Sequence, residues 1–314
     1  MNSTAIAASG LRKAYGDKTI LDGIDLTIEA GTIFSLLGPN GSGKTTTVNV
    51  LTTLAKADGG TARIAGHDLA TEGKAVRAAI GVTGQFAAVD DLLTGEENLR
   101  LMAGLHRLRG DAGKRVVAEL LERFDLVESA GKRAATYSGG MRRKLDLAMT
   151  LVTKPQIVFL DEPTTGLDPR SRRTMWDIVR ELTSEGVTIF LTTQYLEEAD
   201  QLADRIAVLD QGRLVAEGTP DDLKRLVPGS HIQLRFAQPE ELDAAAHSLP
   251  GATRDDSALT LRVPGNGGTK SLRHLLDRLA ESSVEAEEVT VHTPDLDDVF
   301  LSLTGHATTE VSPR

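Results

Sequence analysis

Gly38-Pro39-Asn40-Gly41-Ser42-Gly43-Lys44-Thr45 matches the pattern of a phosphate-binding loop: glycine, four residues of any type, then Gly-Lys-Thr. The apolar run Ile33–Leu37 predicts a strand that enters the loop, and residues 46–54 predict the helix that leaves it. The loop works by wrapping backbone N–H groups around phosphate oxygens, an approach that a Cβ would block. A glycine-rich turn without a ligand is the alternative, and the flanking strand and helix argue against it.

Two side chains of this loop have chemical roles of their own. Lys44 can supply a point charge to the β- and γ-phosphates of a nucleotide, and the hydroxyl of Thr45 can ligate Mg²⁺. Thr46 follows at the start of the predicted helix, whose positive dipole end favours an anion. The loop therefore predicts that the chain binds ATP with Mg²⁺.

Composition narrows the class of protein. The chain has 314 residues, 40% of them hydrophobic, and no apolar run near the ~20 residues of a membrane-spanning helix. Met1 to Gly10 has no pattern of a signal peptide, and there is no cysteine, so we expect a cytoplasmic protein. The net charge of −10 argues against nucleic acid as a partner, although residues 142–144 form a local basic run.

The order of the elements predicts an α/β fold with a second domain. Unbroken apolar runs at 33–37, 157–160, 187–191 and 206–209 suit strands buried on both faces of a parallel sheet. Residues 4–30 predict short antiparallel strands, with turns at Gly16-Asp17 and Asp22-Gly23. Composition shifts near Pro228, so we expect a nucleotide-binding domain over 1–228, with a helical subdomain at about 86–150. A small α+β domain over 229–306 and a tail over 307–314 complete the prediction.

Two further segments complete a candidate site. Asp161 and Glu162 end the buried strand at 157–160, where Asp161 can hold Mg²⁺ and Glu162 can polarise the attacking water as a general base. Ser138-Gly139-Gly140 begins a helix, so its backbone N–H groups and the helix dipole favour an anion. Taken alone, the acidic pair is an ordinary strand end and the serine an ordinary helix cap.

As an ordered set, these motifs resemble the ATP-binding subunits of ATP-binding cassette (ABC) transporters. Residues 38–45 match the Walker A motif, and residues 157–162 match Walker B with its catalytic glutamate. Ser138-Gly139-Gly140 resembles the family signature, with Tyr137 before it and Met141 after it in place of the commoner Leu and Gln. The resemblance implies a P-loop NTPase cassette with a RecA-like core, an antiparallel β subdomain and a helical subdomain. It also implies that Gln85 is the Q-loop glutamine, Asp168 belongs to the D-loop, and Tyr15 stacks on adenine.

One position departs from the family pattern. The switch loop usually carries histidine, and this chain has Gln194. Glutamine can donate a hydrogen bond to a γ-phosphate oxygen, but it cannot become a cation near neutral pH. A charged role for the switch is therefore in doubt, whereas Glu162 keeps the role of general base. A solvated loop residue without a role is the alternative.

The glutamine variant and the stretch Asp295–Gly305 are similar to the daunorubicin-resistance type of ATPase subunit. This resemblance implies a homodimer, with Ser138, Gly139 and Gly140 acting in trans, bound to a separate membrane permease and exporting a drug or antibiotic. The chain would then lie at the cytoplasmic face of the cell membrane, with the region 86–99 against the permease. Export of a lipid or polysaccharide, a soluble ABC ATPase without a transport role, and a regulatory module that only binds ATP are the alternatives.

Overall fold

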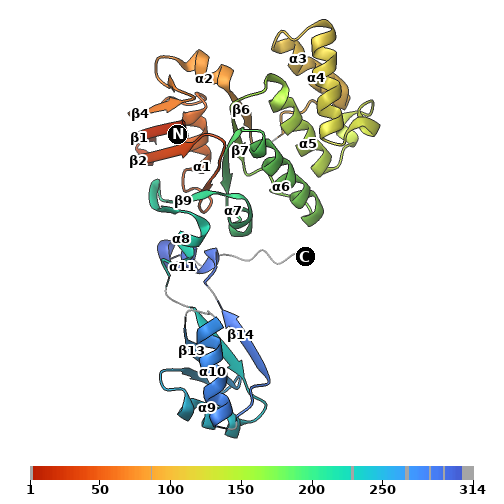
Figure 1. Cartoon of the computed structure of the whole chain (residues 1–314). Helices are drawn as coiled ribbons and strands as arrows, with labels where there is room; N and C mark the ends of the chain where they lie inside the picture. Colours follow the sequence, from red (N-terminus) through yellow and green to blue (C-terminus); the bar gives the residue numbers. More distant parts are fainter. Residues whose placement is uncertain are drawn as a thin grey trace. The chain divides into compact units, whose positions relative to one another are not determined.

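The computed structural model describes residues 3–85, 87–227, 230–265, 269–282, 284–292 and 294–305. The chain divides into two compact units, Met1–Pro220 and Asp221–Arg314. The division precedes the boundary that we expected near Pro228, and Pro228 and Gly229 themselves lie outside the described residues, as do Phe86 and the tail from 306 onward. Figure 1 shows the elements of both units.

The core of the first unit is a six-stranded sheet in the order β10-β9-β3-β8-β7-β6. Neighbouring strands are parallel except for β10, which pairs antiparallel with β9 through the turn at Gln211-Gly212. Every residue of β3, β7 and β8 is buried, which confirms the prediction of strands covered on both faces. The strands are β3 (Ile33–Leu37), β6 (Ile80–Thr83), β7 (Ile157–Asp161), β8 (Thr188–Thr193), β9 (Arg205–Asp210) and β10 (Arg213–Gly218).

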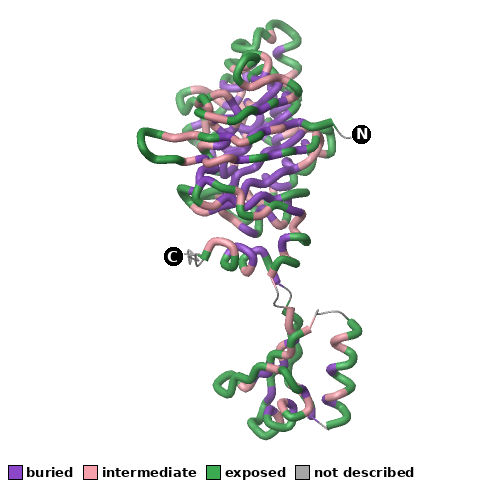
Figure 2. Tube along the Cα trace, turned by 90° about the vertical axis from the view of Figure 1, so that its left-hand side faces the viewer, coloured by how far each residue is buried: buried purple, intermediate pink, exposed green. Residues whose placement is uncertain are grey.

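Alternate residues of these strands face two hydrophobic clusters. Phe34, Phe159 and Phe190 point to one face, where they pack with α1 (Lys44–Leu51). The ring of Phe190 makes tilted contacts with those of Phe34 and Phe159, at 5.7 and 5.2 Å between centroids. Val158, Leu160, Ile189 and Leu191 point to the other face, against α5 (Gly139–Thr150) and α6 (Pro169–Ser184). Two further helices of this unit are α2 (Gly73–Ala79) and α7 (Leu196–Leu202). The tube in Figure 2 shows the buried residues concentrated inside this unit.

An antiparallel sheet in the order β2-β1-β4-β5 packs against the α1 side of the core. Its strands are β1 (Thr4–Tyr15), β2 (Lys18–Glu29), β4 (Gly59–Ile64) and β5 (His67–Asp68). The turn predicted at Asp22-Gly23 is wrong, because β2 runs through it as one strand. Leu11 pairs with Ile24 and Arg12 with Asp22, so Gly23, at φ 81°, is the extra residue of a β-bulge.

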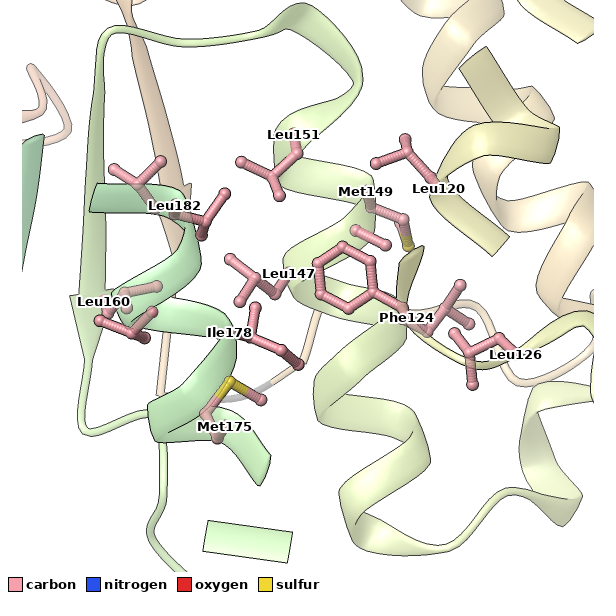
Figure 3. Close-up of a cluster of buried hydrophobic side chains, with 14 of the residues drawn as sticks. Leu120, Phe124, Leu126, Leu147, Met149, Leu151, Leu160, Met175, Ile178 and Leu182 are labelled. Carbon is pink, nitrogen blue, oxygen red and sulfur yellow. The ribbon is translucent and has the colours of Figure 1, made fainter. Parts of the chain in front are cut away.

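A helical subdomain is inserted between β6 and β7. It contains α3 (Gly95–Leu105), α4 (Gly110–Arg123) and α5, with 3-10 turns η1 (Val127–Ser129), η2 (Ala134–Thr136) and η3 (Leu151–Thr153). Figure 3 shows how α5 joins it to the core: Leu147 and Met149 lie between Ile178 of α6 and Leu120 and Phe124 of the α4 segment. One continuous cluster therefore connects the subdomain to the sheet.

The second unit is a small α+β domain with its own core. Its antiparallel sheet has the order β12-β13-β11-β14, and Ile232, Leu234 and Phe236 pack against Leu275 and Leu279. The predicted strands and helices all appear, while α8, α9 and β12 were not predicted. The elements are α8 (Pro220–Lys224), β11 (His231–Arg235), α9 (Pro239–Ser248), β12 (Thr253–Asp255), β13 (Thr260–Pro264), α10 (Thr269–Glu281), β14 (Glu288–His292) and α11 (Leu296–Thr304).

Candidate nucleotide site

The topology brings three predicted segments to one edge of the sheet. β3, β8 and β7 are adjacent and parallel, with Leu37 beside Thr193 and Asp161 beside Thr192. The phosphate-binding loop, Gln194 and the Asp161-Glu162 pair follow directly at the carboxyl ends of these strands. Ligands of open parallel sheets bind outside this edge, so the fold assembles the site from a loop at 38–45 and from segments that follow it by more than 100 residues in sequence.

The glycines of the loop permit close backbone packing. A Cβ on Gly38 would lie 2.3 Å from the carbonyl oxygen of Leu209 and 2.7 Å from Ser42 Oγ. Gly43 has φ 114° and directly precedes α1, in a backbone conformation that L side chains rarely adopt. The Gly38 N–H donates to the Thr193 carbonyl at 3.3 Å, which ties the loop to the end of β8. The loop conformation therefore needs glycine at both positions.

Lys44 is buried within the loop it belongs to. Its Nζ donates to the carbonyl oxygens of Gly38 at 2.9 Å and Pro39 at 3.2 Å, and it lies 3.3 Å from Glu162 Oε1. Burial lowers the pKa of Lys44, and the adjacent Glu162 carboxylate opposes this effect. The candidate general base and the candidate phosphate-binding cation thus form an ion pair inside the site.

Glu162 has an uncommon backbone conformation, with φ 48°. Its N–H donates to the carbonyl and to Oγ1 of Thr192, each at 3.1 Å, and Thr165 Oγ1 donates to Glu162 Oε2 at 3.4 Å. A residue other than glycine in the left-handed region costs roughly 1–2 kcal/mol, and such strain concentrates at functional sites. The contacts to Thr192 hold Glu162 against this strain.

The predicted magnesium ligands are all oxygen donors, which suits a hard cation. Asp161 is buried and accepts a hydrogen bond from the Thr192 hydroxyl, so one of its oxygens is oriented. Thr45 and Gln85 are exposed. In the part of the chain that the structure describes, no cluster of three or more His, Cys, Asp or Glu could hold a metal by itself. The donor set therefore fits an ion that shares its coordination with the phosphates of a nucleotide.

The segment Ser138-Gly139-Gly140 lies against the start of α6, which Asp168 precedes. Ser138 caps α5 by accepting from the Met141 N–H at 3.2 Å, and a Cβ on Gly140 would come within 2.6 Å of Ser171 Oγ. Asp168 caps α6 by accepting from the Ser171 hydroxyl and from two backbone N–H groups. These hydrogen bonds, that of the Ser171 hydroxyl first, lower the pKa of Asp168.

The tyrosine at the start of the signature has a packing role. Tyr137 is buried, its Oη donates to the Ser129 carbonyl at 2.7 Å, and a Cβ on Gly95 would collide with that hydroxyl. Tyr15, the residue expected to stack on adenine, lies at the end of β1 with 53% of its surface exposed and Lys13 Nζ 5.1 Å from the ring centre. The aromatic ring of Tyr15 is thus only partly accessible to a ligand.

The basic run at 142–144 does not form a surface patch. Arg142 pairs with Asp91, Lys144 lies 4.0 Å from Asp125, and Arg143 is buried. Sequence reasoning missed Arg143 as a site residue, because three consecutive basic residues look alike in a sequence. The helical period of three or four residues, with apolar Leu145, Leu147 and Ala148 around it, was the available signal that one of them faces inward.

A second buried group was also missed. Glu198 of α7 is completely buried and accepts a hydrogen bond from Trp176 Nε1 of α6 at 3.1 Å. Burial raises its pKa, and hydrogen bonds oppose this effect. Glu198 lies four residues after Gln194, so this contact attaches the segment around Gln194 to α6, the helix that Asp168 caps.

Comparison with known proteins identifies the family of the chain. The family model described as ABC transporter matches residues 21–165. The daunorubicin resistance ATP-binding protein DrrA3 of Streptomyces coeruleorubidus is 50% identical over 307 residues, 97% of each chain. The Nod factor export ATP-binding protein I of Burkholderia orbicola is 37% identical over 97% of this chain and 98% of its own.

Solved structures agree as well. One described as the ATP-binding subunit of an ABC transporter has 29% identity and a TM-score of 0.64, covering 71% of this chain and 93% of its own. The chain therefore belongs to the ATP-binding proteins of ABC transporters, and it is an ATPase that energises a transporter. Within that family it resembles the daunorubicin-resistance type. Among the described residues, no helix is both long and apolar enough to cross a bilayer.

Proposed function

We propose that the chain is the ATPase subunit of an exporter for drug-like or antibiotic compounds, paired with a separate membrane permease at the cytoplasmic face of the cell membrane. The observation that carries this proposal is 50% identity over 97% of both chains with a daunorubicin resistance ATP-binding protein. Export of a lipid or polysaccharide is the second candidate, because similarity over nearly the whole chain also extends to a Nod factor export protein, 37% identical, that is not named for drug resistance.

At the site, we assign the phosphate cradle to residues 38–46 and adenine stacking to Tyr15. Thr45, Asp161 and Gln85 would hold Mg²⁺, which neutralises charge on the β- and γ-phosphates when bound. Glu162 orients and polarises the attacking water, and Gln194 donates a hydrogen bond toward the γ-phosphate. The ion pair of Lys44 with Glu162 supports this assignment, because a nucleotide that draws Lys44 to its phosphates leaves the carboxylate free to accept a proton.

We further propose a homodimer in which the signature of one chain closes over the nucleotide of the other. The chain carries one copy of each motif, and the start of α5 packs against α6 beside the D-loop. Ser138, Gly139, Gly140 and Asp168 would then complete the partner's site with N–H groups and a capped helix start. The region 86–99 is the proposed permease-facing surface, and within it Leu92 is 78% exposed.

Co-purification tests the proposal. The chain is expressed with the membrane protein encoded beside its gene, and a tag on the chain is used to recover complexes from a detergent extract. We expect a stoichiometric complex whose ATPase activity rises with an anthracycline or another amphipathic drug. Recovery of the chain without any membrane protein, with ribosomal or DNA-associated proteins enriched instead, would overturn it. Stimulation by a lipid or a polysaccharide and by no drug would favour the second candidate.

A further inference from the structure

Two buried charged residues on α5 take no part in the proposed chemistry. Arg143 and Asp146 lie one helical turn apart, with Arg143 Nη1 3.4 Å from Asp146 Oδ2, and they are 7% and 3% exposed. Burial lowers the pKa of Arg143 and raises that of Asp146, and each charge opposes the effect on the other. Buried ion pairs are weak sources of stability, since desolvation offsets their attraction.

The guanidinium of Arg143 connects two loops of the nucleotide site. Its Nη1 donates to the Gly84 carbonyl at 2.7 Å, Nη2 to the Asp161 carbonyl at 3.1 Å, and Nε to the Pro163 carbonyl at 2.9 Å. Gly84 directly precedes Gln85, and Asp161 and Pro163 flank Glu162. One rigid planar group thus fixes the backbone on both sides of the candidate base and the start of the Gln85 loop.

Asp146 contacts the other end of the same loop. Its Oδ1 accepts a hydrogen bond from the Ala88 N–H at 2.9 Å, while its Oδ2 faces Arg143. Gly84, Gln85 and Ala88 are exposed, so the pair contacts an exposed loop from its buried side. The same helix is anchored in the hydrophobic cluster of Figure 3 through Leu147 and Met149. The pair is therefore held by a packed helix and contacts both loops.

We infer that Arg143, oriented by Asp146, is a positioning residue that holds the loop around Gln85, from Gly84 to Ala88, against Glu162. It thereby couples the proposed permease-facing region, which begins in this loop, to water activation. This inference rests on the proposed roles of Gln85 and Glu162. Neither Arg143 nor Asp146 contacts the phosphate-binding loop in any hydrogen bond or ion pair of the described residues. The pair should therefore affect the hydrolysis rate and leave nucleotide affinity unchanged.

Arg143→Lys tests the inference, because lysine keeps the charge and cannot make the three-carbonyl fork. We expect kcat of the basal ATPase to fall about 10- to 100-fold from misplacement of the base, with the Kd for ATP within about twofold of the wild-type value. Asp146→Asn keeps an acceptor for Ala88 and removes the charge, so we expect a smaller fall in kcat. The matched control is Arg180→Lys, since Arg180 also pairs with a carboxylate three residues away and with a backbone carbonyl, but on the surface.

The decisive readout is kcat measured beside Kd and Tm, well below the melting temperature. A lower kcat with unchanged Kd supports positioning. A lower Tm with unchanged kcat and Kd would overturn it, because the pair would then only stabilise the fold. If Arg143→Lys fails to fold, Asp146→Asn decides by the same measurements. The reference is the ATPase activity of the wild-type chain, alone or with its permease, so a wrong assignment of the exported compound would leave this result intact.

Discussion

Replacing Glu162 with glutamine removes the negative charge that faces Lys44 and should separate nucleotide binding from hydrolysis. Both side chains are more than nine-tenths buried and their charged atoms lie 3.3 Å apart. At an effective dielectric constant of about 20, that separation corresponds to an attraction of roughly 5 kcal/mol. Most of it is offset, because the buried carboxylate loses hydration that a neutral amide does not need. Glutamine still offers an oxygen to Lys44, so a net loss of about 1–2 kcal/mol is expected.

For a unit of this size, that loss lowers the melting temperature of the nucleotide-free protein by roughly 2–8 °C. Loss of a general base lowers kcat by about 10²- to 10⁴-fold. Affinity for ATP should be unchanged or higher, because Lys44 and the phosphates no longer face a competing carboxylate. Thermal unfolding, titration with ATP and steady-state hydrolysis measure the three quantities separately.

Glu119→Gln is the matched control, since Glu119 is exposed on α4 and has no ion pair or hydrogen bond among those described. Its Tm and kcat should match the wild type. A Glu162→Gln variant that hydrolyses ATP at the wild-type rate would refute the assignment of the base. Loss of ATP binding in that variant would refute the claim that the carboxylate competes with the phosphates for Lys44.

Three further variants probe other parts of the unit. Gly38→Ala places a Cβ 2.3 Å from a backbone carbonyl oxygen, so it should lower the free energy of unfolding by about 1–3 kcal/mol and weaken ATP binding. Gly131→Ala, with open space around the added Cβ, should change neither. Equal denaturant midpoints for the two variants would contradict this prediction. Burial raises the pKa of Glu198, so its contribution to stability is greatest below the ordinary carboxyl pKa and is lost as pH rises through the folded-state pKa. The free energy of unfolding of Glu198→Gln, measured in urea, should therefore increase relative to that of the wild type as pH rises. Parallel pH profiles of the two proteins would contradict this prediction. Gln194→His should retain ATPase activity within about threefold, because both side chains can donate to the same oxygen, and an inactive folded variant would show that they cannot.

The motifs that lie on continuous backbone were predictable from sequence. The loop at 38–45 is recognisable from sequence because its glycines, lysine and threonine lie within eight residues. β3 and α1 confirm the strand and the helix predicted on either side of it. The apolar runs predicted buried strands, and β7 and β8 are buried along their whole length. Element boundaries were less predictable: Gly23 reads as a turn in sequence, and only pairing with β1 reveals a bulge.

Side chains that act across elements were not predictable. Arg143 lies in a run of three basic residues, and no local pattern distinguishes a solvated arginine from one that connects Gly84 with Asp161. The ion pair of Lys44 with Glu162 joins residues 118 positions apart, and its existence depends on β3 and β7 lying on either side of β8. Sequence alone determined which chemical groups the chain possesses and the fold class that its periodicities favour. Tertiary structure decided which groups are desolvated and with which groups they form hydrogen bonds and ion pairs, because burial and strand order are properties of the packed sheet and helices together.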